Sequence, residues 1–269
     1  MRVVSWNMGM ARQSHHRPGL HDQAWHYLLG LGPDLAFVQE ALPPSWVRSE
    51  GALIQGPFTQ WGSAIFSPRY PIERFLLPDE TPLRALGSYL ALGLASLPDG
   101  SDALVASVHA VDRKATKAQL GNLDPASVAR TPRTHPWVSD VVFVGLDSLI
   151  RRRQFIVAGD WNTARRFGSR RSSRMAEAFF RRARGREWFE CINEKSGQEM
   201  RTWFRSGSQP SQIDHAFCNH ALHEKLQGVR VGTDAAEHLE LSDHAPLILD
   251  FDIAPIAMTS LNDAAHKQE

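Results

Sequence analysis

With 269 residues, a formal net charge of +1 and 42% hydrophobic residues, the chain has the composition of a soluble globular protein, which excludes disordered and collagen-like classes. No apolar run reaches the roughly 18 residues of a membrane span, and the N-terminus does not resemble a signal peptide, so we expect a cytoplasmic protein without a membrane segment. The two cysteines, Cys191 and Cys218, are too few for a disulfide framework or a thiolate zinc site, and we expect both to lie in the core.

Short β-rich runs alternate with amphipathic helices along the whole chain, and no repeat or domain linker interrupts them. Runs of β-branched and aromatic residues between turn residues predict strands, and apolar residues three and four positions apart predict helices. In chain order we predict a strand at 2–6, a helix at 21–31, strands at 34–40, 62–67, 88–97 and 103–109, a helix at 136–152, a strand at 154–160, a helix at 173–184, and strands at 201–204, 212–219 and 245–253. We expect one domain over residues 1–254 and a flexible tail at 255–269.

The helix predicted at 173–184 combines an apolar stripe with many arginines. Ser172 or Ser173 is expected to cap its N-terminus. The buried stripe is predicted to contain Met175, Ala178, Phe179 and Ala183. The side chains expected to point outward are those of Arg174, Arg181, Arg182 and Arg184.

Positive charge is concentrated around the strand predicted at 154–160. Twelve arginines against two acidic residues give residues 151–186 a formal charge of +10, which leaves −9 for the rest of the chain. A solvated helix face usually alternates in sign, and this one does not, so we expect the block to bind a polyanion. The substrate-binding candidates are the four arginines that follow the strand directly, Arg165, Arg166, Arg170 and Arg171.

Polar residues stand where several of the predicted strands end. An acid or amide after a strand usually begins a turn, so each residue alone indicates little. Strand ends can meet in space although they are far apart in the sequence, and together these residues predict a site. The set comprises Asn7, Gln39, Glu40, His109, Asp160, Asn162, Asp214, Asp243 and His244.

The chain carries, in order, the motifs WN, QE, a strand ending in His109, GDWN, SQIDHAF and SDHAP. This set resembles the endonuclease/exonuclease/phosphatase superfamily, which includes pancreatic deoxyribonuclease, apurinic endonucleases, neutral sphingomyelinases, inositol polyphosphate phosphatases and deadenylases. The resemblance runs from Val3 to about Phe251, and GDWN and SDH are its most specific elements. It implies an α/β (α+β) fold, a four-layer αββα sandwich of two mainly antiparallel sheets flanked by helices, with the site at one rim.

Hydrolysis of a phosphate ester requires neutralised charge on the phosphoryl oxygens, a positioned water, and an acid or cation near the leaving oxygen. Carboxylate and amide oxygens are the ligands that Mg²⁺ or Mn²⁺ prefers, and Mg²⁺ takes few ligands from the protein. The resemblance implies that Glu40 is the principal metal ligand, that Asn7 supports it, and that Asp243 contributes directly or through water. Without the other motifs, Glu40 would equally well be an acid at a helix start.

Asp160 is the candidate to orient or deprotonate the attacking water, and Asn162 the candidate to donate its amide to a phosphate oxygen. In an extended segment both side chains project to one side, while Trp161 points the other way, into packing. The resemblance pairs His244, as a contact of the scissile phosphate, with Asp214. A neighbouring carboxylate raises the pKa of a histidine and fixes its tautomer.

His109 separates branches of the superfamily. Deoxyribonuclease-like and sphingomyelinase-like members have a second histidine at this strand end, whereas apurinic endonucleases have a tyrosine, so His109 favours the first group. A second histidine can protonate the leaving oxygen. The acid that usually orients it is not evident before the strand at 62–67, where Gln60 stands instead.

Two other regions bear on the substrate. The segment between His109 and Trp137 is long, basic and rich in turn residues, and is either a substrate loop or an exposed connection. Trp203 and Phe204 either contact the substrate, where the family often places an aromatic residue, or pack in the core.

These residues predict a divalent-metal-dependent phosphodiesterase that acts on nucleic acid, DNA in preference to RNA, most simply a deoxyribonuclease-like endonuclease. The alternative is a hydrolase of a small phosphoester, such as a phospholipid headgroup or an inositol phosphate, although no hydrophobic membrane-inserting hairpin is visible. A third reading is an inactive scaffold that binds nucleic acid. The complete set of catalytic residue types argues against it.

Overall fold

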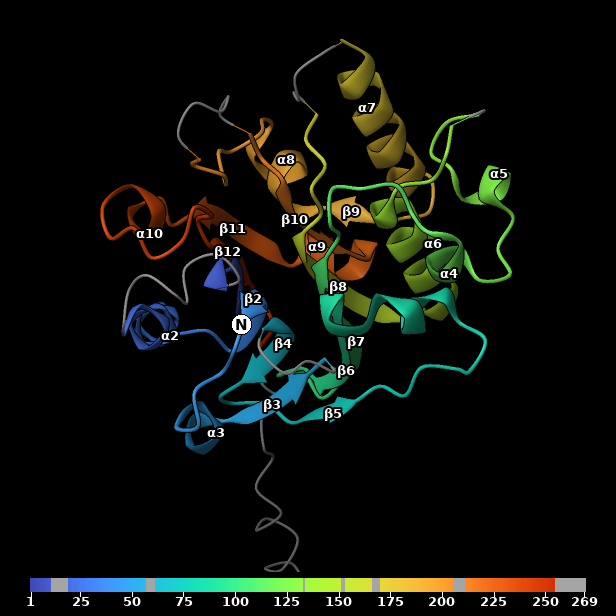
Figure 1. Ribbon diagram of the computed structural model, residues 1–269. Helices are drawn as coiled ribbons and strands as arrows, with labels where there is room; N and C mark the ends of the chain where they lie inside the picture. Colours follow the sequence, from blue (N-terminus) through green and yellow to red (C-terminus); the bar gives the residue numbers. More distant parts are fainter. Residues whose placement is uncertain are drawn as a thin grey trace, which may run out of the picture.

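The computed structural model describes residues 1–10, 19–56, 61–132, 134–150, 153–165, 170–205 and 211–254, with only the backbone of Arg170 and Arg171. Two six-stranded sheets form the centre of the protein (Figure 1). The tail predicted at residues 255–269 lies outside the described residues. Within them, no helix is both long and apolar enough to cross a membrane.

The first sheet is built from the N-terminal quarter and the C-terminal end of the described chain. In spatial order its strands are β11 (Leu226–Val231), β12 (Leu247–Phe251), β1 (Arg2–Asn7), β2 (Leu35–Ala41), β4 (Gly62–Ser67) and β3 (Ala52–Gln55). The pair β1 and β2 is parallel, and the other neighbouring pairs are antiparallel. Parallel neighbours need a crossover connection, which here contains helix α2 (Leu20–Gly30).

The second sheet holds the middle of the chain. In spatial order its strands are β5 (Ile72–Arg74), β6 (Leu90–Ser96), β7 (Asp102–His109), β8 (Gln154–Asp160), β10 (Asp214–Cys218) and β9 (Phe189–Glu190). Strands β7 and β8 are parallel. The crossover between them contains three helices, α4 (Lys117–Leu120), α5 (Pro125–Val128) and α6 (Val138–Ile150).

The two sheets pack face to face through their apolar sides. Val3 and Phe37 from the first sheet belong to the same buried cluster as Val105 and Ile156 from the second. On the outer side of the first sheet, α2 contributes Trp25 and other apolar residues to a separate buried cluster. The central strands are covered on one face by the other sheet and on the opposite face by helices. Their sequences are therefore nearly continuous apolar runs.

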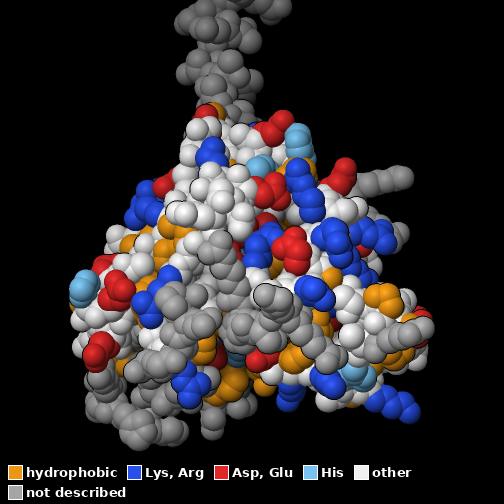
Figure 2. All heavy atoms as spheres, turned by 90° about the horizontal axis from the view of Figure 1, so that it is seen from above, with side chains coloured by type: hydrophobic (Ala, Val, Ile, Leu, Met, Phe, Trp, Pro, Cys, Tyr) orange, Lys and Arg blue, Asp and Glu red, His pale blue; other side chains and the backbone are white. Residues whose placement is uncertain are grey.

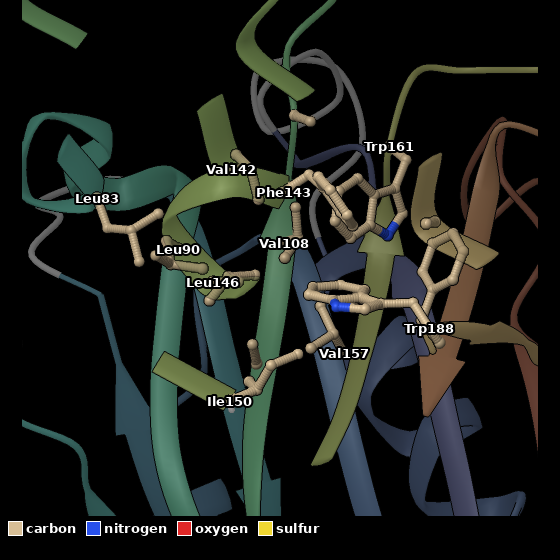
Figure 3. Packing of buried hydrophobic residues seen from close by; sticks show 14 of the residues in the cluster. Leu83, Leu90, Val108, Val142, Phe143, Leu146, Ile150, Val157, Trp161 and Trp188 are labelled. Atoms are coloured by element: carbon tan, nitrogen blue, oxygen red, sulfur yellow. The ribbon is translucent and has the colours of Figure 1, made fainter. Parts of the chain in front are cut away.

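The outer side of the second sheet is covered by α6 and α7 (Arg170–Arg184). Figure 3 shows Phe143 and Leu146 of α6 packing over Val108 of β7 and Val157 of β8, with Trp161 beside them. The order of layers is therefore helix, sheet, sheet, helix. The αββα sandwich expected from the resemblance is confirmed.

The remaining helices are short, namely α3 (Val47–Glu50), 3₁₀ helix η1 (Pro82–Tyr89), α8 (Cys191–Ser196), α9 (His220–Glu224) and α10 (Asp234–Glu237). Both cysteines are buried, as expected. The strand predicted at 201–204 is wrong, because only Trp203 makes isolated bridges there, to Ser211 and His244. The segment after His109 is also more ordered than a loop, since it contains α4 and α5.

Helix α7 differs from its prediction in three ways. It begins at Arg170, so Ser172 and Ser173 lie in its first turn and are not the residue before it. Ala178, Phe179 and Ala183 are buried as predicted, whereas Met175 is only half-buried. Arg182 does not point freely outward, because its guanidinium donates to the carbonyls of Ser127 and Val128 and lies over the ring of Phe143. This arginine joins α7 to the crossover segment.

Candidate active site

The register of the second sheet brings three predicted site residues into line. His109 at the end of β7 pairs with Asp160 at the end of β8, and Asp160 pairs with Asp214 at the start of β10. All three side chains are buried. Residues separated by more than 100 positions along the chain therefore occupy neighbouring positions at one rim of the sheet, with Asp160 in the middle.

Asn7 joins this rim to the first sheet. It ends β1, and its Nδ2 donates to Asp160 Oδ2 at 3.0 Å and to Glu40 Oε1 at 3.4 Å. Its own Oδ1 accepts from the backbone N–H of Gly9 at 3.0 Å. Because Glu40 belongs to β2 and Asp160 to β8, the carboxamide fixes the spacing of one carboxylate from each sheet.

His109 faces the same two carboxylates. Its Nε2 lies 3.5 Å from Glu40 Oε1 and 3.7 Å from Asp160 Oδ2. The ring also packs edge-on against Tyr89 and near Trp61, with centroids 5.4 and 6.3 Å away. These aromatic neighbours could not be predicted from the sequence, because η1 and Trp61, the residue before β4, are brought to His109 only by the fold.

The acid that sequence analysis failed to find for His109 is thus supplied across the rim by Glu40 and Asp160. Gln60, which stands where the family usually has the orienting acid, lies outside the described residues. The departure from the family pattern does not leave the imidazole without acidic neighbours.

His244 and Asp214 form a buried pair. His244 Nδ1 donates to Asp214 Oδ2 at 2.9 Å, and the backbone carbonyl of His244 accepts from Trp6 Nε1 at 2.8 Å. Burial alone would lower the pKa of His244, but the charges of Asp214 and Asp160 and the hydrogen bond to Asp214 raise it to about 10. The imidazole therefore carries a positive charge at neutral pH, and Nδ1 is committed to Asp214.

The carboxyl group of Asp160 is buried, and burial disfavours its negatively charged form. Its pKa is raised to about 7, chiefly by burial and also by the neighbouring Asp214, while the charge of His244 and hydrogen bonds from Asn162 and Asn7 oppose the shift. Such a value places Asp160 near the balance between its two protonation states at neutral pH. A general base is most effective when its pKa lies close to the working pH.

The backbone around Asp160 is shaped for a close approach. Gly159 has φ of 150°, and a Cβ added there would lie 1.9 Å from the carbonyl oxygen of Val108 on β7. Asn162 has φ of 47°, a left-handed conformation that is rare for residues other than glycine. Its backbone N–H donates to Asp160 Oδ1 at 2.9 Å.

The extended geometry expected for residues 160–162 is therefore wrong. Strand β8 ends at Asp160, and the chain turns at Asn162 because the carboxylate of Asp160 captures the amide two residues later, as Asp often does in turns. Trp161 does point into packing, where it is fully buried. Left-handed residues of this kind gather at functional sites, and Glu40 is a second example here, with φ of 45°.

His215 supports the same turn and was overlooked in the sequence. Its Nε2 donates to the carbonyl of Thr163 at 2.7 Å, and its Nδ1 lies 3.1 Å from Glu190 Oε1 and 2.9 Å from Gln212 Nε2. All of these side chains are buried. A histidine directly after Asp214 in SQIDHAF is visible in the sequence, but its partners Thr163 and Glu190 come from distant segments.

Asp243 lies beside the aromatic residues that precede β10. Its Oδ2 accepts from Trp203 Nε1 at 3.3 Å, and its carbonyl accepts from the backbone N–H of Phe204 at 2.7 Å. Trp203 and Phe204 are both half-buried. Trp203 thus orients the carboxylate of Asp243, a contact that is compatible with either of the two roles expected for this residue.

This geometry can be compared with known proteins. The model of the Endonuclease/Exonuclease/phosphatase family matches residues 4–244. The chain belongs to this family. No curated protein sequence matches it significantly.

Solved structures of family nucleases share the fold at low sequence identity. The 3'-5' exonuclease NExo from Neisseria meningitidis superimposes with a TM-score of 0.64 and 16% identity, over 94% of this chain and 100% of that one. An AP endonuclease from Archaeoglobus fulgidus gives 0.61 and 14%, with the same coverage. The endonuclease domain of TRAS1, a telomere-specific non-LTR retrotransposon, gives 0.59 and 13%, over 94% and 98% of the two chains.

The donor set at the rim fits the hard divalent cation that the family implies. Glu40 and Asp160 bring two carboxylates within hydrogen-bonding distance of one Asn7 amide, which concentrates negative charge. In the part of the chain that the structure describes, no group of three or more His, Cys, Asp or Glu side chains could hold an ion. A cation here would therefore take few ligands from the protein and keep several waters, as Mg²⁺ usually does.

The predicted arginine contacts are only partly placed. Arg165 Nη1 lies 2.9 Å from Glu177 Oε2, and its guanidinium stacks over Phe180 with 3.9 Å to the ring centroid. Arg166 lies outside the described residues, and the side chains of Arg170 and Arg171 are not described. On the face shown in Figure 2, basic and acidic side chains are interspersed. Arg165 is engaged in packing, which distinguishes it from a freely extended phosphate contact.

Proposed function

We propose that this protein is a divalent-metal-dependent phosphodiesterase that hydrolyses nucleic acid as a deoxyribonuclease-like endonuclease, with DNA preferred to RNA. One observation carries the proposal. Asp160 stands between His109 and the His244–Asp214 pair, at the rim where Asn7 and Glu40 converge. At this buried rim Asp160 can act as a base, the imidazolium of His244 carries a positive charge, and Glu40 with Asn7 offers hard oxygen ligands for a metal ion. Phosphodiester hydrolysis requires groups of these three kinds.

In the proposed reaction Asp160 accepts a proton from a water molecule as the water oxygen bonds to phosphorus. The imidazolium of His244, held by Asp214, neutralises charge that develops on a non-bridging oxygen. The bond from phosphorus to the leaving oxygen breaks, and His109 supplies the proton which that oxygen takes up. Asn162 donates to a phosphate oxygen. Glu40, supported by Asn7 and Asp243, would hold a metal ion, which would supply further neutralisation of the phosphoryl charge.

Relatives of the same fold support nucleic acid as the substrate class. The similar structures are described as nucleases, and a substituted form of NExo is described as a 3' phosphatase bound to product DNA hairpin. The second candidate is hydrolysis of a small phosphoester. It is favoured by one observation, the engagement of Arg165 and Arg182 in contacts within the protein, which leaves fewer arginines for a long polyanion.

The test is an assay of purified protein with Mg²⁺ or Mn²⁺ on linear duplex, closed circular, single-stranded and RNA substrates, beside phospholipid and inositol phosphate controls. Cutting of the closed circle is the expected result, since only an endonuclease can open it. Asp160→Asn serves as the matched inactive variant, because it keeps the size of the side chain. Release of phosphate or headgroup from the small substrates without any cutting of nucleic acid would establish the second candidate.

Metal dependence has its own expected outcome. EDTA should abolish activity, and Mg²⁺ or Mn²⁺ should restore it. Glu40→Gln should raise the metal concentration needed for half-maximal activity by roughly tenfold or more, because a neutral amide binds a hard cation less well than a carboxylate does. A metal titration of wild type and variant measures this, and full activity of metal-free protein in EDTA would exclude the site.

A further inference from the structure

A hollow of about 160 Å³ lies directly beside the candidate active site. It is bounded by residues that follow β7 and β8 and by the N-terminal turns of α6 and α7. Its lining includes Val111, Arg130, Trp137, Asn162 and Met175. Asn162 thus belongs both to the active-site turn and to this hollow, which makes the two continuous.

The walls of the hollow suit a flat, largely apolar group. Trp137, Met175 and Val111 are half-buried, so each offers apolar surface that is not already covered. A cavity of roughly 150 Å³ in another protein holds a benzene ring, so the volume here is that of a ring system and not of a second polymer strand. Indole and thioether groups both make favourable contacts with aromatic rings.

The polar end of the hollow does not favour a second phosphate. The guanidinium of Arg130 is neutralised, because its Nε donates to Asp140 Oδ1 at 2.8 Å and its Nη2 donates to Ser139 Oγ. Asp140 also accepts from the backbone N–H of Trp137 at 2.8 Å, which fixes the start of α6. Asp112, exposed on the lining, adds a negative charge that would repel an anion.

We propose that this hollow is a subsite for a nucleobase, that of the nucleotide adjoining the scissile phosphate. The inference rests on the proposed function and adds to it the part of the substrate that is recognised. A phosphodiester bound at Asp160 and Asn162 carries a nucleoside on either side. Because Asn162 also lines the hollow, one of these nucleosides lies close enough to place its base there. The base stacks on Trp137 with Met175 at its edge, and the paired Arg130 offers no competing anion site.

The inference can be tested by equilibrium binding in EDTA at low salt, which removes catalysis from the measurement. The ligands are dAMP, dTMP and 2-deoxyribose 5-phosphate, and isothermal titration calorimetry gives their dissociation constants. Wild type should bind the nucleotides more tightly than the base-free sugar phosphate by a factor on the order of 10, the usual contribution of base stacking. Equal binding of all three ligands, or absence of binding by all three, would overturn the inference.

Two variants locate the effect. Met175→Trp fills the hollow and should remove the difference between nucleotide and sugar phosphate. Leu76→Trp adds the same indole at a side chain that is 81% exposed and outside the hollow, and should leave the difference intact. If Met175→Trp fails to fold, Trp137→Leu keeps an apolar wall while removing the stacking surface, and should reduce the difference. Loss of the difference in Leu76→Trp as well would assign it to something other than this hollow.

Cleavage distinguishes the failure of this inference from the failure of the proposed function. Cutting of closed circular DNA with Mg²⁺ is measured on the same preparation of wild type that is used for binding. An enzyme that cuts DNA but binds base-free and base-bearing ligands equally lacks the subsite and keeps the proposed function. A protein that prefers nucleotides but cuts no nucleic acid keeps the subsite, and the proposed function falls.

Discussion

At the rim, the cost of burying charged side chains is offset by neighbouring opposite charges and hydrogen bonds. Asp160 is buried beside Asp214, and the charge of His244 and hydrogen bonds from Asn162 and Asn7 offset this negative charge. Catalytic groups are often held by the surrounding structure in positions that reduce the stability of the folded protein. Activity and stability should therefore respond in opposite directions to substitutions at Asp160.

Asp160→Asn tests this opposition. The amide oxygen keeps one of the two hydrogen bonds that the carboxylate accepts, from Asn162 or from Asn7, and the amide cannot take a proton from water. Turnover should therefore fall by a factor on the order of 10² or more. Because the raised pKa of Asp160 makes its charged form unfavourable in the folded state, the neutral amide should raise the melting temperature at pH 8. Turnover and thermal unfolding measured on the same preparation check both parts. A folded variant with near-normal turnover would contradict the role of Asp160.

The His244–Asp214 pair gives a prediction with a definite pH range. The folded-state pKa of His244 is raised to about 10, above the unfolded value of roughly 6.5. Its contribution to stability is therefore fully present below about pH 6.5 and is lost as the pH rises through about 10. Asp214→Asn removes the negative partner, so the pKa of His244 should fall.

Titration of the His244 ring by NMR in EDTA measures this pKa in wild type and in Asp214→Asn. The destabilisation caused by Asp214→Asn should also shrink as the pH rises toward 10, because the imidazole loses its charge in both proteins. A pKa of His244 that is the same in the two proteins would show that Asp214 does not hold the charge of the ring.

At the scale of elements, the site depends on how closely β7 and β8 approach at their ends. Gly159 lies one residue before Asp160, and a side chain there would overlap the carbonyl of Val108. The parallel pairing of these strands, which aligns His109 with Asp160, therefore requires glycine at this position. The turn that follows is held on its other side by His215, through the carbonyl of Thr163.

Gly159→Ala should destabilise the protein by roughly 3 kcal/mol, as expected when a methyl group is forced against backbone. Gly228→Ala in β11 is the matched control, because a Cβ there meets nothing within 4 Å. Urea unfolding of both variants measures the free energy of unfolding. Equal, small effects in the two variants would mean that the strands can separate without cost and that the close approach is not required.

At the scale of the whole molecule, the sandwich places candidate catalytic residues from both sheets at one rim, while α6 and α7 lie outside the second sheet (Figure 1). The arginine-rich start of α7 follows Asp160 by about ten residues in the chain. The proposed enzyme would therefore divide its tasks, with chemistry between the sheets and binding of a long anion along one flank.

Replacement of Arg166, Arg170 and Arg171 by Gln tests this division. The logarithm of affinity for DNA should fall linearly with the logarithm of salt concentration, by roughly 0.9 for each duplex phosphate contacted. The triple variant should bind more weakly and with a flatter slope, while hydrolysis of bis-p-nitrophenyl phosphate changes little. Arg74→Gln, in β5, is the control and should leave the slope unchanged. An unchanged slope in the triple variant would assign these arginines to a solvated surface.

The amino-acid sequence predicted the inner strands of both sheets, the three longest helices and the candidate residues of the site. Strand ends such as Asp160 and helix stripes such as that of α7 are visible because burial imposes a local period on the chain. Asn7, Glu40 and His244 could be named because each stands in a short motif next to a strand. These are local properties, and the structure has strands at every predicted position except 201–204. The edge strands β3, β5, β9 and β11 were not predicted.

Which of these residues touch, and how their charges balance, depends on the tertiary structure. Three sets of contacts join segments that are far apart in the chain: Asn7 with Asp160, the carboxylates with His109, and His215 with the carbonyl of Thr163. Their distances depend on how the two sheets pack. The left-handed turn at Asn162 likewise depends on a side chain folding back onto its own backbone. The periodicity of the sequence indicates whether a residue is buried. A raised pKa also depends on which charged groups lie beside the buried residue, and the fold brings these groups together at the rim.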